Sequence, residues 1–183
     1  MRTSVHRGEV DIPEGIEVEL RDREFHVRGP LGEISKSFVR VPVKFQISDK
    51  TVAFEIHRKG KKGASLVNTI RKILMNLFTG VSRGFTYKMK IYYRHFPISV
   101  SVSDKFVTIK NFTGERGSRR AKIVGDASVK VKGDDVIITG LSKEEVALTA
   151  ANIQRRCEIK RKDPRVFLDG IYLYSKSEGL GDA

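Results

Sequence analysis

Basic side chains concentrate between residues 110 and 122, in the segment KNFTGERGSRRAK. This segment holds five cations against one acid, and its two glycines let the backbone turn tightly. The planar guanidinium of arginine bonds to phosphate oxygens through two N–H groups at once, so arginines on such a loop suit phosphate binding. A loop that is merely solvated is the alternative. The expected nucleic-acid contacts are Lys110, Arg116, Arg119, Arg120 and Lys122.

A second basic cluster, RRCEIKRKDPR, covers residues 155–165. The helix dipole alone stabilises one or two cations at a helix C-terminus, but six in eleven residues need a further reason. We expect these side chains to meet a polyanion: Arg155, Arg156, Lys160, Arg161, Lys162 and Arg165.

A third basic group alternates with tyrosines and leaves two interpretations open. It comprises Arg83, Lys88, Lys90 and Arg94, interleaved with Tyr87, Tyr92 and Tyr93. In a strand, such alternation places tyrosines in the core and lysines in solvent, which needs no ligand. Contact with RNA is the other interpretation, and the sequence does not favour either one.

Enzyme chemistry finds no support in the residue pattern. The four histidines, His6, His26, His57 and His95, lack the spacing of a metal-binding pair. Cys157 follows Ile153 by four residues, so it is expected in a helix's packed face and not as a nucleophile. We therefore expect no catalytic residue, no cofactor and no metal.

Two further motifs are explained by local structure. The acidic pairs Asp134-Asp135 and Glu144-Glu145 fit a turn and the first turn of a helix, where acids are structurally favoured. The run KGKKGAS (59–65) lacks the spacing and the final Lys-Ser of a Walker phosphate loop, so it is expected to form a basic turn before a helix.

The composition favours a nucleic-acid partner. Lysine and arginine total 35 against 22 acids, a formal charge of +13 with a pI near 10.0. Residues up to 82 carry 15 basic and 10 acidic side chains and the rest carry 20 and 12, so the second half is expected to dominate binding. No apolar run is long enough to span a bilayer and the start resembles no signal peptide, which favours a cytoplasmic location.

An internal repeat organises the chain. The stretch IEVELRDREFHVRGPLGE (16–33) aligns without a gap on ISVSVSDKFVTIKNFTGE (98–115). Both alternate apolar and polar residues, turn at an Asp-containing pair, and alternate again, which is typical of a β-hairpin. Similarly, the expected strand 49–56 corresponds to 133–140.

Each copy continues with a helix and one more strand. Apolar residues at helical spacing predict a helix over 66–78 with Gly80 as its C-terminal cap. Ser142 and Glu145 form a capping box ahead of Val146, Ala150, Ile153 and Cys157. The strands that follow are expected at 85–93 and 170–176.

This order predicts an α+β protein made of two tandem copies of a small domain. Each copy is expected to be a mostly antiparallel β-sheet with one main α-helix around a single core. We place the first repeat at 1–82, the second at 83–176 as the main RNA-binding domain, and a flexible tail at 177–183.

Three stretches also resemble a known family: GVSRGFTYKMKIYYRHFPISV (80–100), GERGSRR (114–120) and TAANIQRRCEIKRKDPRVFLDGIYLYSK (149–176). Together with the opening IPEGIEVEL hairpin, they are similar to the large-ribosomal-subunit protein six family of the archaeal and eukaryotic type. The resemblance extends over nearly the whole chain.

The resemblance implies a structural, ribosome-bound protein of the cytoplasm that is not an enzyme. It implies binding to 23S-like large-subunit ribosomal RNA, mainly through the carboxy-terminal domain. It further implies a place near the sarcin-ricin loop and the stalk base, with translation factors nearby and other ribosomal proteins as neighbours. Neither a membrane nor a small-molecule substrate is expected. A free RNA-binding regulator is the alternative.

Overall fold

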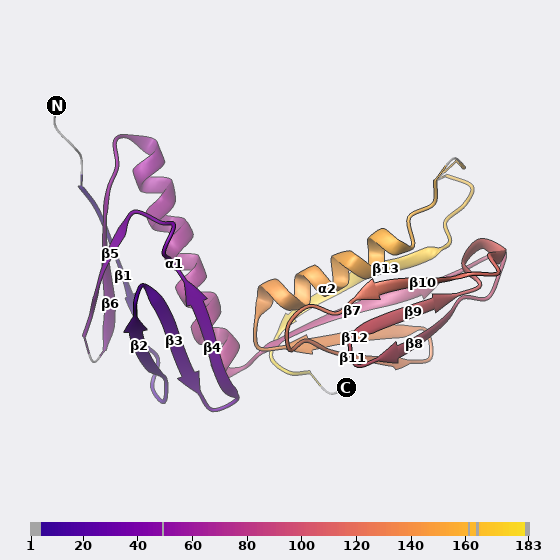
Figure 1. Ribbon diagram of the computed structural model, residues 1–183, viewed down its shortest axis with the longest axis horizontal. Coiled ribbons are helices and arrows are strands. Elements are labelled where there is room, and N and C mark those ends of the chain that lie inside the picture. Colours follow the sequence, from indigo (N-terminus) through magenta and orange to yellow (C-terminus); the bar gives the residue numbers. More distant parts are fainter. Residues whose placement is uncertain (1–4, 49, 161, 164, 182–183) are drawn as a thin grey trace. The chain divides into compact units, whose positions relative to one another are not determined.

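The computed structural model describes residues 5–48, 50–160, 162–163 and 165–181 (Figure 1). The chain divides into two units, Met1–Arg83 and Gly84–Ala183. Within the described residues, no helix combines the length and the apolar character that crossing a membrane requires.

The first unit packs one long helix against two small sheets. Its elements are β1 (Val5–Asp11), β2 (Glu17–Arg21), β3 (Glu24–Gly29), β4 (Gly32–Ser37), β5 (Val43–Ile47), β6 (Thr51–His57) and α1 (Lys61–Ser82). The sheets have the orders β1-β6-β5 and β2-β3-β4, with antiparallel pairs throughout. Phe25, Phe38 and Phe45 meet edge to face in the core, with ring centroids 4.6 to 5.5 Å apart.

The second unit repeats this plan with one strand more. Its elements are β7 (Phe85–Tyr92), β8 (Ser99–Ser103), β9 (Phe106–Lys110), a 3-10 turn (Phe112–Gly114), β10 (Ser118–Lys122), β11 (Ser128–Lys132), β12 (Asp135–Gly140), α2 (Lys143–Arg156) and β13 (Gly170–Glu178). The sheets have the orders β10-β9-β8 and β11-β12-β7-β13, again antiparallel.

Each helix and strand of the first unit has a counterpart in the second unit, and this combination of one helix with antiparallel sheets confirms the predicted α+β class. The hairpin β2-β3 corresponds to β8-β9, and the three strands β5, β6 and β1 correspond to β11, β12 and β7. The expectation that the strand at 85–93 ends the first copy is wrong, because this segment forms β7 in the sheet of the second unit. The first unit's described residues contain no strand equivalent to β13. The second unit therefore has a four-stranded sheet in place of a three-stranded one.

The helix ends were predicted with mixed success. Ser142 caps α2, and its hydroxyl accepts a hydrogen bond from the Glu145 N–H (3.4 Å), as the capping box predicts. The expected cap at Gly80 is wrong, because α1 continues to Ser82 and the left-handed turn (φ 77°) falls at Gly84. Val81 is fully buried in the first core, and this burial outweighs the cost of about 1 kcal/mol for a glycine inside a helix.

The basic run 59–65 also differs from expectation. Gly60 precedes the helix with a positive φ of 65°, and α1 begins at Lys61. Most of this run is therefore the first turn of α1 and not a separate turn.

Two strands of the second unit include residues that the sequence pattern does not predict as strand. Residues 118–122, expected as loop, form β10 and pair with β9. The last strand runs to Glu178, so the expected tail begins inside the sheet. Beyond it, the Thr86 hydroxyl donates to the Gly179 carbonyl (2.7 Å) and accepts from the Gly181 N–H (3.0 Å).

Candidate nucleic-acid interface

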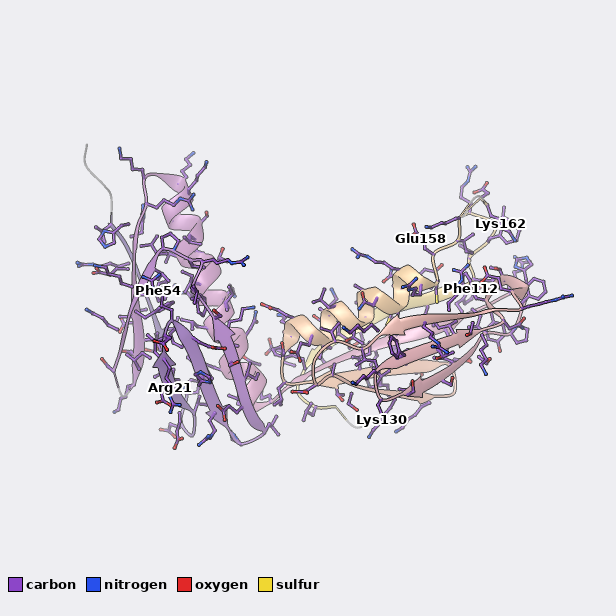
Figure 2. The ribbon with its side chains drawn as sticks, in the orientation of Figure 1. Arg21, Phe54, Phe112, Lys130, Glu158 and Lys162 are labelled. Carbon is purple, nitrogen blue, oxygen red and sulfur yellow. The ribbon has the colours of Figure 1, made fainter. Side chains whose placement is uncertain are left out.

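The fold gathers two separate basic clusters around one depression on the second unit, of about 700 Å³. We call this depression the basic groove. Its cationic lining is Arg119 and Arg120 from β10, Arg155 and Arg156 from α2, and Lys160 and Lys162 from the segment after α2. Among the described residues that line it, the only acids are Glu115 and Glu158. Figure 2 labels Phe112, Glu158 and Lys162 at this part of the unit.

Packing at the end of α2 fixes one wall of the basic groove. Ile153 and Cys157 are buried, 0% and 5% exposed, which anchors the last turn of the helix in the core. The burial of Cys157 confirms its predicted place in that apolar row. Arg155 and Arg156 lie between these two anchors and remain exposed, so their charges face solvent.

The alternation of β10 fixes the other wall. Ala121 is fully buried and Arg119, two residues earlier, lies on the same inward side. Arg120 is exposed on the opposite side and is paired across the sheet with Thr108. Two arginines that are adjacent in sequence therefore have different environments.

Arg119 is held by contacts within the protein. Its Nε donates to Glu115 Oε2 (2.9 Å), and its Nη2 donates to Oε1 of the same carboxylate. Its Nη1 donates to the carbonyl oxygens of Arg156 (2.7 Å) and Glu158 (3.4 Å), and its guanidinium lies 4.4 Å from the Phe112 ring centroid. Most donors of Arg119 are thus engaged, so the expectation of a free loop arginine is wrong for this residue.

The pairing with Arg119 also sets the protonation of Glu115. The hydrogen bonds from the guanidinium lower the pKa of the Glu115 carboxyl, and the same bonds raise the pKa of Arg119. One acid of the basic groove is therefore neutralised by one cation. The other five cations form no ion pair with any residue in the described ranges.

The remaining predicted contacts that the structure describes lie outside the groove lining. Lys110 and Lys122 are exposed at the ends of β9 and β10, and Arg116 is exposed just before β10. Arg165 is paired with Asp163 (Nη2 to Oδ2, 3.2 Å), and this hydrogen bonding lowers the pKa of the Asp163 carboxyl. Arg161 lies outside the described residues.

The third basic group is divided by the structure. Tyr87 is only 5% exposed and belongs to the core, whereas Tyr92 is 46% exposed. Lys90 Nζ lies 3.5 Å from the Asp135 carboxylate, and the backbone N–H of Arg94 donates to the buried Asp169 carboxylate (2.9 Å). The interpretation that all the tyrosines lie in the core therefore holds for Tyr87 but not for Tyr92, and contact with RNA stays a prediction for the exposed residues.

The thiol of Cys157 is in an unreactive environment. Burial disfavours the charged thiolate and raises the pKa of the thiol to about 12, although the Arg119 charge acts in the opposite direction. In the part of the chain that the structure describes, no three His, Cys, Asp or Glu side chains come together as metal ligands could.

Comparison with known proteins gives matches along most of the chain. The family model described as "Ribosomal protein L6" matches residues 12–84 and again 96–170, once in each unit. The chain is 46% identical over 170 residues to "Large ribosomal subunit protein uL6" of Methanobrevibacter smithii, which covers 93% of this chain and 96% of the relative.

Two further relatives carry the same description. The protein of Desulfurococcus amylolyticus is 45% identical over 174 residues (93% of this chain, 95% of the relative). That of Methanosarcina mazei is 41% identical over 168 residues (92% and 96%). The similarity thus extends through both units.

Proposed function

This chain belongs to the ribosomal protein L6 family, a structural family of the large ribosomal subunit, and we propose that it binds large-subunit ribosomal RNA through the basic groove of its second unit. The observation that supports this most strongly is the gathering of Arg120, Arg155 and Arg156 with two lysines around one concave surface. Cations that form no ion pair within the described residues retain their charge for neutralising phosphates.

The type of recognition follows from the side chains. Double-stranded RNA is recognised mainly by its shape, its phosphates and its 2′-hydroxyls, because its major groove is too narrow for side chains to read. Guanidinium groups suit this task since they bond to two phosphate oxygens at once. Lys110 at the end of β9, Arg116 just before β10 and Lys122 at the end of β10 are exposed and add to the positive charge of this unit.

The two units have different parts in this proposal. The second unit, Gly84–Ala183, is the main RNA-binding domain in this proposal, since it carries the basic groove and the larger net charge. The first unit serves as a scaffold. The proposed position is near the sarcin-ricin loop and the stalk base, where translation factors dock beside neighbouring ribosomal proteins; the resemblance in sequence supports this position.

Cosedimentation tests the proposal against its alternative, a free RNA-binding regulator. The purified chain, added to salt-washed large subunits that lack the endogenous protein, should remain with the subunits in high salt. A variant with Arg120, Arg155 and Arg156 changed to Ala should be released at lower salt. Retention of this variant to the same salt concentration would contradict a role for the groove, and a wild-type chain that stays unbound would contradict the ribosomal role.

A further inference from the structure

A second surface of the second unit has the composition of a nucleic-acid platform. It is the outer face of the sheet β11-β12-β7-β13, the face that does not contribute Met89, Val136 and Ile138 to the core. Strand register places its side chains in rows. One row holds Lys132, Asp135 and Lys90, and the next holds Lys130, Ile137 and Lys88.

Tyr174 lies across this face. Strand β13 pairs Leu173 with Met89 and Ser175 with Lys88, so Tyr174 is an extra residue in a β-bulge. Its hydroxyl donates to Asp135 Oδ1 (3.3 Å) on β12, which is on the far side of β7. The side chain therefore crosses over β7, and it remains 57% exposed.

Tyr92 adds a second aromatic ring to the same face. It follows Lys90 by two residues on β7, so both side chains emerge on the same side, and it is 46% exposed. Tyr172 contributes less, because its ring packs over Gly170 and its hydroxyl donates to the Leu168 carbonyl. We call the set Lys88, Lys90, Tyr92, Lys130, Lys132 and Tyr174 the Tyr-Lys face.

The charge of the Tyr-Lys face is almost entirely positive. Asp135 is the one acid that the strand register places on this side of the sheet, and it is engaged by both Lys90 (3.5 Å) and Tyr174. Lys130 and Lys132 on β11 are exposed and form no ion pair with another described residue. Lys130 is labelled on this sheet in Figure 2.

The first unit provides an internal comparison for this composition. The equivalent face of β1-β6-β5 carries Arg7 and Lys44 against Glu9, Asp11 and Glu55. Arg7 and Glu55 neutralise each other at 2.7 Å, and the strand register places His57 but no tyrosine, phenylalanine or tryptophan on that side. Two copies of one fold therefore differ on one face in both charge and aromatic content, so the fold itself does not require the lysines and tyrosines.

We propose that the Tyr-Lys face binds unpaired nucleotides of RNA, with bases stacked on Tyr174 and Tyr92 and phosphates held by the surrounding lysines. Exposed aromatics on a four-stranded sheet stack unstacked bases, and cations beside them follow the backbone. This inference rests on the proposed RNA-binding function and deepens it. The basic groove binds structured RNA through phosphate, whereas the Tyr-Lys face selects single strands.

Binding of a single-stranded RNA of about 12 alternating U and C nucleotides tests this inference, with an RNA duplex of equal length as a second probe. The chain has no tryptophan, so its fluorescence reports on tyrosine directly. We expect saturable quenching by the single strand. Tyr174→Ala and Tyr92→Ala should each weaken this binding by about 5- to 150-fold and leave duplex binding unchanged.

Conservative variants separate stacking from folding. Tyr174→Phe should keep the affinity, because the ring remains, but lose part of the quenching. Tyr93→Ala is a matched control, since Tyr93 is 42% exposed but follows the end of β7. Tyr92→Ala and Tyr93→Ala should have the wild-type unfolding temperature, whereas Tyr174→Phe and Tyr174→Ala should each show a small loss, because both lack the hydroxyl that bonds to Asp135.

Three results would overturn the inference without affecting the basic groove. The first is no saturable quenching by the single strand, and the second is wild-type affinity in both Ala variants. The third is that the two Ala variants bind the oligonucleotide with wild-type affinity but are retained more weakly on large subunits. That result would assign the face to a contact with another protein. Failure of the ribosomal role, by contrast, would appear in the cosedimentation of the wild-type chain.

Discussion

Arg119 on β10 donates to the backbone carbonyl of Arg156, 37 residues later, at a distance of 2.7 Å. This bond joins the wall that β10 provides to the end of α2, where backbone carbonyls lack helical partners. The same guanidinium holds Glu115 and lies over Phe112. Arg119 therefore shapes the basic groove, and its neighbour Arg120 is available to a ligand.

Replacing Arg119 should cost stability, whereas replacing Arg120 should not. Arg119→Ala leaves the carbonyl oxygens and the Glu115 carboxylate without their donor, and we expect a loss of about 1.5 to 3 kcal/mol in the free energy of unfolding. Arg120→Ala removes an exposed side chain and should change it by about 0.5 kcal/mol or less. Urea unfolding of the two variants makes the comparison. Equal stabilities would refute the structural role of Arg119.

The groove cations should determine the salt dependence of RNA binding. For a variant with Arg120, Arg155 and Arg156 changed to Ala, each lost phosphate contact should reduce the slope of log K against log salt by roughly 0.7 to 1. The matched control changes Lys59, Arg71 and Lys72 to Ala, which removes the same charge from exposed positions of the first unit. An equal reduction in both variants would show that net charge alone matters.

Cys157 should be unreactive in the folded chain. Its thiol is buried with a pKa of about 12, so iodoacetamide at about pH 8 should modify it only after unfolding in urea. The pKa in the folded state is raised, so this group's contribution to stability is intact below the ordinary 9.0 and is lost as the pH rises towards 12. Cys157→Ala should lessen that alkaline decline. Rapid modification of the native chain would contradict its burial.

Acid should weaken the bond between Glu115 and Arg119. The pKa of Glu115 is lowered in the folded state, so its contribution is intact above the ordinary 4.5 and is lost as the pH falls below that value. The Glu115→Gln variant cannot titrate, and its unfolding midpoint should fall less steeply than that of the wild type between about pH 5 and pH 3. Parallel curves for the two proteins would exclude this source of acid sensitivity.

The hydrophobic cores of the two units should unfold independently of each other. Phe25 is fully buried with Phe38 and Phe45 in the first core, which shares no residue with the second. Phe25→Ala should cost about 3 to 5 kcal/mol, enough to unfold much of a small domain. Amide exchange should then rise in the first unit only, with RNA binding by the basic groove retained. Exchange that rises equally in both units would contradict the proposed division.

The periodicity of apolar residues predicted those features of the fold that depend only on residues close together in the sequence. The hairpins, both helices and the burial of Cys157 all follow from local alternation or helical spacing. The basic groove does not, because it forms only where β10 packs beside the end of α2. Arg119 and Arg120 are the same residue type at adjacent positions, and only the pairing of β10 with β9 shows which one faces inward.

The sequence pointed to only part of the Tyr-Lys face, because Lys88, Lys90 and Tyr92 belong to the third basic group but Lys130, Lys132 and Tyr174 do not. The sequence 87–93 alternates as a strand should, yet Tyr87 and Tyr92 emerge on opposite sides because their separation is an odd number of residues. The position of Tyr174 depends on a bulge that shifts the register of β13 by one residue. Neither the bulge nor its hydroxyl contact on β12 has a signal in the composition of the segment.

The hydrogen bond from the Thr86 hydroxyl to the Gly179 carbonyl joins residues 93 positions apart, so the second unit cannot be completed until nearly the whole chain has been synthesised. Synthesis proceeds from the N-terminus, so all the elements of the first unit have been made once residue 82 has been added. Strand β7 is made next, but it cannot pair until its two neighbours in the sheet, β12 and β13, have also been made. Closure of the second sheet is therefore a late and non-local step, which favours slow folding. A nascent chain that stops before residue 170 has a complete first unit and a central strand with one bare edge, which is a template for aggregation.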